Sequence, residues 1–257
     1  MKNKILIASD LDNTLLVSHR NRRDGDVCVE MYNGNEQTFM TKRSIELLRQ
    51  VNKKIGFAPV TTRSLEQYRR IMWPEGCEPE YAVVSNGAIL LNQGAIDEEW
   101  SQQIRLVVSA CRDEMMAQYE RLSLSKNFLR CHIVDDSYLF LYCNEDTDVK
   151  ACAENCCRHT MLDVEYLGRK IYLFPTGLNK GESLKRLKIF LGCEYTYAAG
   201  DSFIDVPMLN AADVSFAPEV IQCMTGANCL IQPKGTVFSE WVLEKIAIIL
   251  DIYDAIS

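Results

Sequence analysis

The chain has 257 residues, of which 47% are hydrophobic and 25% are charged, a composition typical of globular proteins that excludes a disordered chain. The net charge is −7 and no basic run is longer than residues 20–23, which argues against nucleic acid as a partner because its recognition usually needs a basic face. No apolar stretch approaches the roughly 18 residues of a membrane span, and the N-terminus carries no secretion signal, so we expect a cytoplasmic protein with no membrane partner.

Strand and helix signals alternate over the first 87 residues, which is typical of a parallel sheet. Ile5 begins a buried apolar strand, and Ser64 and Gln67 form the capping box of a helix. The elements predicted here are a strand at 5–9, a flap hairpin within 18–40, a helix at 41–54, a strand at 57–60, a helix from 64 and a strand at 81–84.

The pattern changes after Gly87, where hairpin turns at 92–94 and 135–137 indicate an α+β unit with an antiparallel sheet. The elements predicted here are a hairpin at 89–96, one long helix at 97–121, a hairpin at 128–143, a helix at 147–159 and short strands near Val164 and Tyr172.

From Leu178 onward the alternation returns, with a helix, a strand at 195–199, a short helix, strands at 214–216 and 229–231, and a terminal helix. We therefore predict an α/β fold with a Rossmann-like parallel core and an inserted α+β cap domain. The core comprises residues 1–87 and 177–257, and the cap comprises residues 88–176.

The eleven cysteines are expected to stay reduced, because the chain is neither small nor visibly secreted. Cys152, Cys156, Cys157 and His159 lie close together in sequence, but a second pair of ligands, as in most zinc sites, is missing. We interpret these cysteines as thiols that pack like small hydrophobic side chains.

Carboxylates follow the strands of the predicted core. Asp10 and Asp12 come directly after the first strand, where side chains two apart in an extended segment point to the same side. Ligands of open α/β sheets bind at the carboxyl ends of the strands. Two carboxylates that meet there favour a hard cation such as Mg²⁺ or a shared proton.

Further polar residues fall at strand ends or helix starts of the same core: Thr61, Lys180, Asp201 and Asp205. A hydroxyl, a lysine and four carboxylates suit phosphoryl transfer. The metal and the lysine would neutralise phosphate charge, and one aspartate would attack phosphorus to give an aspartyl-phosphate.

Four motifs in this order resemble those of the haloacid dehalogenase superfamily. They are DLDNTLL at residues 10–16, VTTR at 60–63, LNKG at 178–181 and GDSFID at 200–205. The unit inserted after the SNGA segment at 85–88 resembles the cap of the type IIB subgroup, which includes the Cof-type and sucrose-phosphatase-like sugar phosphatases. Within that subgroup, VTTR followed by QYRR at 67–70 is most similar to the hydrolases of tellurium-resistance-associated gene clusters.

The resemblance implies a role for each matching residue. Asp10 would be the nucleophile, and Asp12 would protonate the leaving oxygen and then deprotonate the attacking water. Thr61 and Lys180 would act in catalysis and hold the phosphoryl group, and Asn86 would lie near the substrate at the hinge. Mg²⁺ would be bound by Asp10, by the main-chain carbonyl of Asp12, by Asp201 and, through water, by Asp205.

Some positions differ from the family pattern or have no assigned role. Ile204 stands where many capped relatives carry Asn, which removes one polar contact to the site. Arg63 is interpreted as structural or phosphate-adjacent. Four basic residues of the cap, Lys126, Arg130, Arg169 and Lys170, are candidates for reading the substrate, although ordinary solvated positions are favoured for each.

We therefore predict a hydrolase, a Mg²⁺-dependent phosphatase that acts on a small phosphate monoester such as a sugar phosphate through an aspartyl-phosphate. Two alternatives stay open. One is a phosphotransferase or phosphomutase on the same scaffold, and the other is a non-catalytic protein that binds a phosphate ligand.

Overall fold

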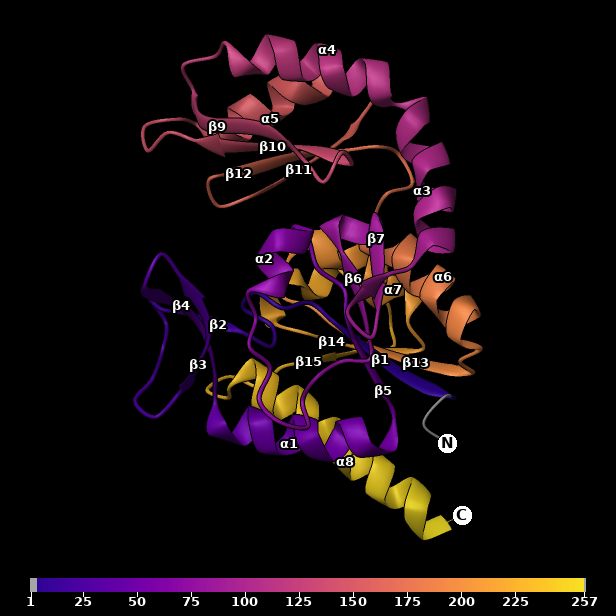
Figure 1. Cartoon of the computed structure of the whole chain (residues 1–257). Coiled ribbons are helices and arrows are strands. Elements are labelled where there is room, and N and C mark those ends of the chain that lie inside the picture. Colours follow the sequence, from indigo (N-terminus) through magenta and orange to yellow (C-terminus); the bar gives the residue numbers. More distant parts are fainter. Residues whose placement is uncertain (1–3, 257) are drawn as a thin grey trace.

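A five-stranded parallel sheet lies at the centre of the computed structural model, which describes residues 4–256 (Figure 1). Its strand order is β15-β14-β13-β1-β5, and all neighbouring pairs run parallel. The strands are β1 (Ile5–Ser9), β5 (Gly56–Pro59), β13 (Tyr195–Ala199), β14 (Val214–Ala217) and β15 (Cys229–Ile231). The predicted Rossmann-like parallel core is confirmed.

Helices cover both faces of this sheet, because alternate residues of each strand point to opposite sides. Ile7 of β1 belongs to the apolar cluster under α1 and α8, whereas Leu6 and Ala8 belong to the cluster under α6 and α7. The helices are α1 (Lys42–Lys54), α6 (Lys180–Leu191), α7 (Val206–Ala211) and α8 (Phe238–Ile256). Within the part of the chain that the structure describes, no helix is both long enough and apolar enough to cross a membrane.

A flap of three strands stands beside the core at the left of Figure 1. Its strands are β2 (Val17–Ser18), β3 (Val27–Tyr32) and β4 (Asn35–Met40), in the order β2-β4-β3. The β3–β4 hairpin turns at Asn33 and Gly34, both with positive φ, as a two-residue turn requires. The flap returns the chain to α1, whose N-cap Thr41 accepts a hydrogen bond from the Ser44 amide.

A short antiparallel sheet connects the core to the cap. It contains β6 (Tyr81–Val84), β7 (Ile89–Asn92) and β8 (Ala95–Ile96), and a parallel bridge between Val60 and Val83 joins it to the end of β5. The predicted capping box at Ser64 and Gln67 is present at the start of α2 (Leu65–Arg69).

The cap is a four-stranded antiparallel sheet with two helices on the face away from the core (Figure 1). Its sheet order is β11-β12-β10-β9. The elements are β9 (Phe128–Val134), β10 (Tyr138–Cys143), β11 (Asp163–Leu167), β12 (Lys170–Phe174), α4 (Arg112–Ser123) and α5 (Val149–Arg158). The α+β character predicted for this part of the chain is confirmed. All eleven cysteines are free thiols, and Cys156 of α5 is packed in the apolar interior of the cap.

The prediction of one long helix at 97–121 is wrong, because the chain forms two helices there. They are α3 (Glu98–Ala110) and α4, and they meet at Cys111. Cys111 has φ −111° and ψ 4°, which is outside the helical region. The two helices bury their apolar faces against different partners, since α3 contacts β7 beside the core and α4 contacts β9 in the cap. A straight helix would cover only one of these surfaces.

Candidate active site

The carboxyl ends of β1, β5 and β13 lie side by side, and the polar residues predicted for the site follow them. Ser9 pairs with Pro59 on one side and with Ala199 on the other. The ladder continues beyond the strands, since the Asp10 amide donates to the Ala199 carbonyl over 2.9 Å. Asp10, Thr61 and Asp201 therefore begin from the same edge of the sheet, where open α/β sheets bind ligands.

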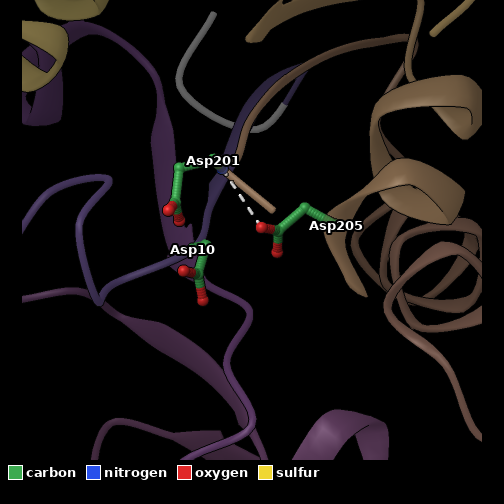
Figure 2. Close-up of side chains that lie close together, drawn as sticks. All are labelled: Asp10, Asp201 and Asp205. Carbon is green, nitrogen blue, oxygen red and sulfur yellow. Dashed lines mark hydrogen bonds between the residues drawn. The ribbon is translucent and has the colours of Figure 1, made fainter. Parts of the chain in front are cut away.

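Asp10, Asp201 and Asp205 form a carboxylate triad, shown in Figure 2, in which one oxygen from each lies within 4.8 Å of the others. Asp205 is fully buried, and its Oδ2 accepts hydrogen bonds from the Asp201 amide (3.1 Å), the Ser202 amide (2.9 Å) and the Ser202 hydroxyl (2.7 Å). Gly200 makes this turn possible, because a Cβ there would lie 2.3 Å from the Asp205 Cβ. Oxygen atoms from three carboxylates are the donor set that hard divalent cations prefer.

Lys180 lies between two members of the triad. Its Nζ donates to Asp10 Oδ1 over 2.5 Å and to Asp205 Oδ1 over 2.6 Å, and the side chain is 2% exposed. Burial opposes the charge of this lysine, but the two carboxylates outweigh that effect and raise its pKa. Gly181 lets α6 approach α7 at this point, since a Cβ there would lie 2.5 Å from the Pro207 carbonyl oxygen.

Three carboxylates share the single positive charge of Lys180. Burial raises the pKa of Asp10 well above its usual value, and the neighbouring carboxylates add to the effect while Lys180 opposes it. Burial, with Asp205 as the next cause, raises the pKa of Asp201 to about 7. Asp10 and Asp201 therefore bind protons more readily than ordinary carboxylates, and a cation would replace those protons.

The Asp12 side chain lies outside the triad. Both of its oxygens are held by Arg63, with Nε 3.0 Å from Oδ2 and Nη2 2.8 Å from Oδ1. Although burial works in the opposite direction, the charge and hydrogen bonds of Arg63 hold the Asp12 pKa below its usual value. The Asp12 side chain is 45% exposed, so it faces the space between core and cap while Arg63 anchors it.

Thr61 and Asn86 lie on neighbouring loops that follow β5 and β6. Thr61 is fully buried, and its Oγ1 accepts from the Arg63 amide over 3.2 Å. The main-chain amide of Asn86 donates to the Thr61 carbonyl, and the side-chain Nδ2 of Asn86 donates to the Leu178 carbonyl over 3.0 Å. The buried Oδ1 of Asn86 has no hydrogen-bond partner among the described residues.

Three residues that were not among the predicted catalytic, substrate or metal residues contribute to this geometry. Thr14 donates to Asp201 Oδ1 over 3.1 Å, and it is the threonine of the DLDNT motif, so that motif carried the signal. Arg63 holds Asp12, and Glu30 of the flap holds Arg63 with 2.8 Å between Oε2 and Nη1. No sequence pattern links Glu30 to Arg63, because they are 33 residues apart and meet only when the flap packs on the core.

Ile204 does not leave the metal site without polar contacts. It is 7% exposed and belongs to the apolar core, one residue before Asp205. The hydrogen bonds to Asp205 come instead from the Asp201 amide and from Ser202.

The tip of the β9–β10 hairpin of the cap rests on the loops that carry Thr61 and Asn86. The Tyr138 hydroxyl donates to the Thr62 carbonyl over 2.7 Å. Asp135 Oδ2 accepts from the Leu65 amide over 2.8 Å and from the Ser85 hydroxyl. The cap therefore contacts the core next to the site.

Only some of the basic cap residues face this site. Lys170 lies on the same face of β12 as Tyr172 and Phe174, and its charge acts on the Asp12 pKa. Arg169 turns away, since its guanidinium lies 4.8 Å from the centre of the Tyr142 ring and donates to the Cys143 carbonyl.

Comparisons with known proteins agree with this geometry. Residues 116–219 match the model of a family described as haloacid dehalogenase-like hydrolase. No curated protein matches the chain.

Several solved structures share the fold over nearly the whole chain. Sucrose-phosphatase from Synechocystis, in complex with sucrose and phosphate, has 16% identity and a TM-score of 0.67, covering 98% of this chain and 99% of its own. A haloacid dehalogenase-like hydrolase from B. subtilis has 19% identity and a TM-score of 0.61, covering 94% and 98%. A trehalose-6-phosphate phosphatase related protein has 16% identity and a TM-score of 0.60, covering 95% and 97%. These structures confirm the predicted fold, and the match at residues 116–219 supports the predicted resemblance to the haloacid dehalogenase superfamily.

Proposed function

We propose that this chain is a haloacid dehalogenase-like hydrolase, a cytoplasmic Mg²⁺-dependent phosphatase that hydrolyses a small phosphate monoester through an aspartyl-phosphate on Asp10. The observation that carries the proposal is the buried set of Asp10, Lys180 and Asp205 with Asp201 beside it. In this set one carboxylate is fixed by a lysine at the edge of the sheet where phosphate esters would enter.

The residues present fit a divalent cation. The triad offers oxygen donors from Asp10, Asp201 and Asp205 within 4.8 Å of one another. Burial, followed by the charge of Asp205, raises the pKa of Asp201, and a bound cation would oppose both effects. Mg²⁺ would be held by these residues, together with the main-chain carbonyl of Asp12. When bound, Mg²⁺ neutralises charge on the phosphoryl oxygens.

The first transfer breaks the ester bond. We expect Asp10 Oδ2 to attack phosphorus, because Lys180 already holds Oδ1. The electron pair of the breaking P–O bond goes to the leaving oxygen, which takes a proton from Asp12. Lys180 stabilises the charge on the phosphoryl group.

The second transfer returns Asp10 to its starting state. Water attacks phosphorus and gives its proton to Asp12, and the bond between phosphorus and Asp10 breaks to release inorganic phosphate. Arg63 lowers the Asp12 pKa, so Asp12 is ionised before this step and can accept the proton. Asp12 must enter the first transfer in its protonated form, so proton donation to the leaving oxygen is the step that its contact with Arg63 opposes.

Thr61 and Asn86 are the residues that we expect to contact the substrate, together with Lys180. The Asn86 Oδ1 is a buried acceptor that lacks a donor among the described residues, which suits a hydroxyl of the substrate or a water molecule. A sugar phosphate or a similar polar metabolite supplies such hydroxyls, and sucrose-phosphatase is among the proteins that share this fold.

We take the unit over residues 88–176 as the cap and residues 1–87 with 177–257 as the core.

Hydrolysis of 4-nitrophenyl phosphate with and without Mg²⁺ tests the proposal. We expect activity that requires the metal and falls by about 10³-fold or more in Asp10→Asn, because the nucleophile is lost. The proposal is wrong if the folded wild type is no faster than this variant across a broad panel of metabolite phosphates. Adding a competing alcohol distinguishes the phosphotransferase alternative, in which the phosphoryl group would pass to the alcohol rather than to water.

A further inference from the structure

The flap carries a buried carboxylate outside the carboxylate triad. Glu30 of β3 is 3% exposed, and its Oε2 accepts from the Thr38 hydroxyl over 3.1 Å and from Arg63 Nη1 over 2.8 Å. Its other oxygen accepts from Arg70 Nε over 3.1 Å. A buried carboxylate is costly unless it is paired and hydrogen-bonded, and Glu30 is fully supplied with donors.

Arg63 connects this carboxylate to Asp12. Its Nη1 binds Glu30, while its Nε and Nη2 bind the two oxygens of Asp12. The guanidinium group is planar and rigid, so a hydrogen bond that fixes one nitrogen also fixes the plane presented by the other two. The Arg63 side chain is 9% exposed, whereas the Asp12 side chain is 45% exposed.

The network joins three segments of the core. Glu30 comes from the flap, Asp12 follows β1, and the two arginines lie on either side of α2. Two carboxylates, Asp12 and Glu30, face the guanidinium groups of Arg63 and Arg70, and Arg70 also pairs with the exposed Glu66 over 3.4 Å. Glu30 shares the single charge of Arg63, which would otherwise act on Asp12 alone.

We propose that Glu30 is a positioning residue that, through Arg63, sets the orientation of the Asp12 carboxylate toward the leaving group. This inference rests on the proposed function, in which Asp12 transfers a proton to that group. Glu30 does not touch the triad, so its role concerns proton transfer and not metal or phosphate binding.

Two esters with different leaving groups test this role. 4-Nitrophenyl phosphate releases a stable phenolate and needs little protonation, whereas glycerol 2-phosphate releases an alkoxide that must be protonated. We expect Glu30→Gln to lower kcat on glycerol 2-phosphate by about 10- to 100-fold, since general acid catalysis is worth about 10² or more, and to lower kcat on 4-nitrophenyl phosphate several times less. The KM values and the Mg²⁺ requirement should stay unchanged.

A double-mutant cycle with Asp12→Asn separates positioning from general damage. If Glu30 acts only through Asp12, Glu30→Gln adds no further loss on glycerol 2-phosphate once Asp12 is Asn. Losses that multiply would overturn the inference. An equal drop on both esters in Glu30→Gln would also overturn it.

Glu36→Gln is the matched control. Glu36 lies on β4 of the same flap and pairs with Arg22 over 2.7 Å, but Arg22 does not reach Asp12. We expect this variant to have wild-type rates on both esters, and a changed ratio of the two rates would point to the flap as a whole and overturn the role of Glu30.

A second variant covers the case in which Glu30→Gln does not fold. Glu30→Asp keeps the negative charge in the flap but shortens the side chain by one methylene group, which withdraws the carboxylate from Arg63, and the same change in the ratio of rates is expected. A wild type without Mg²⁺-dependent activity on either ester would overturn the proposed function and the inference together. An active wild type with an unchanged ratio in Glu30→Asp would overturn the inference alone.

Discussion

Replacing Lys180 with Met tests whether one lysine balances the carboxylate triad. Met is close to Lys in length and lacks the charge, so Lys180→Met removes both hydrogen bonds of Nζ, at 2.5 Å to Asp10 and 2.6 Å to Asp205, with little change in volume. The variant leaves the carboxylates buried without their cation.

The expected loss of stability follows from that burial. Removing one partner of a buried ion pair costs about 3–5 kcal/mol, and Lys180 is 2% exposed, so solvent does not screen it. Asp10 already has a raised pKa and can take a proton when Lys180 is absent, which places the expected loss near the lower limit, at about 3 kcal/mol. For a chain of this size about 1 kcal/mol lowers Tm by about 2–4 °C, so Tm should fall by about 6–12 °C.

Thermal unfolding in metal-free buffer at about pH 8 is the assay. Lys188→Met is the matched control, since Lys188 lies on the same helix and pairs with Asp213 over 2.8 Å in a partly exposed position, where an ion pair is worth about 1 kcal/mol or less. An unchanged Tm for Lys180→Met, or an equal fall in both variants, would refute the idea that Lys180 neutralises the triad. We also expect kcat to fall by about 10²–10³-fold in the folded variant.

Two further predictions concern the triad. Burial and the neighbouring carboxylate Asp205 raise the pKa of Asp201 to about 7. The metal-free protein therefore loses stability as the pH rises through that value, and Mg²⁺ should raise Tm more at about pH 8 than at about pH 6. Equal shifts of Tm at the two pH values would contradict this prediction. Gly200→Ala should lower both Tm and Mg²⁺-dependent activity, because the new Cβ would lie 2.3 Å from the Asp205 Cβ. Gly226→Ala is the control, because its Cβ would lie 3.6 Å from the nearest atom, and its Tm and activity should stay near those of the wild type. If Gly200→Ala kept wild-type Tm and activity, Asp205 could move without consequence and the prediction would be wrong.

The sequence was sufficient to predict which residues gather at the end of the sheet. Asp10 and Asp201 follow parallel strands, and parallel strands end at a common edge. Lys180 joins them because Asn179 caps α6 at that edge and Gly181 allows close packing on α7. Each of these signals is local. The alternation of strands and helices, with polar residues at their ends, was therefore enough to predict that Asp10, Asp201 and Lys180 lie together.

The partners of Asp12 could not be predicted in the same way. The expectation that Asp10 and Asp12 converge came from the spacing of side chains in an extended segment, but in the structure Asp10 binds Lys180 and Asp12 binds Arg63. Arg63 is placed by Glu30, whose position depends on how the flap packs against the core. Such pairings between distant segments are decided by tertiary packing, which has no periodic pattern in the sequence. The break at Cys111 has the same origin, since α3 and α4 pack on different sheets.

The contacts of the cap link its movement to the loops that carry Thr61 and Asn86. Opening the cap would break the hydrogen bond from Tyr138 to the Thr62 carbonyl and those from Leu65 and Ser85 to Asp135. Each is worth about 1 kcal/mol net, so the closed state is favoured by about 3 kcal/mol from these contacts. Two of the core partners are immediate neighbours of Thr61 and Asn86. Under the proposed function, we expect substrate entry to disturb the loops that carry Thr61 and Asn86, and we expect closure to restore them and exclude water from the first transfer.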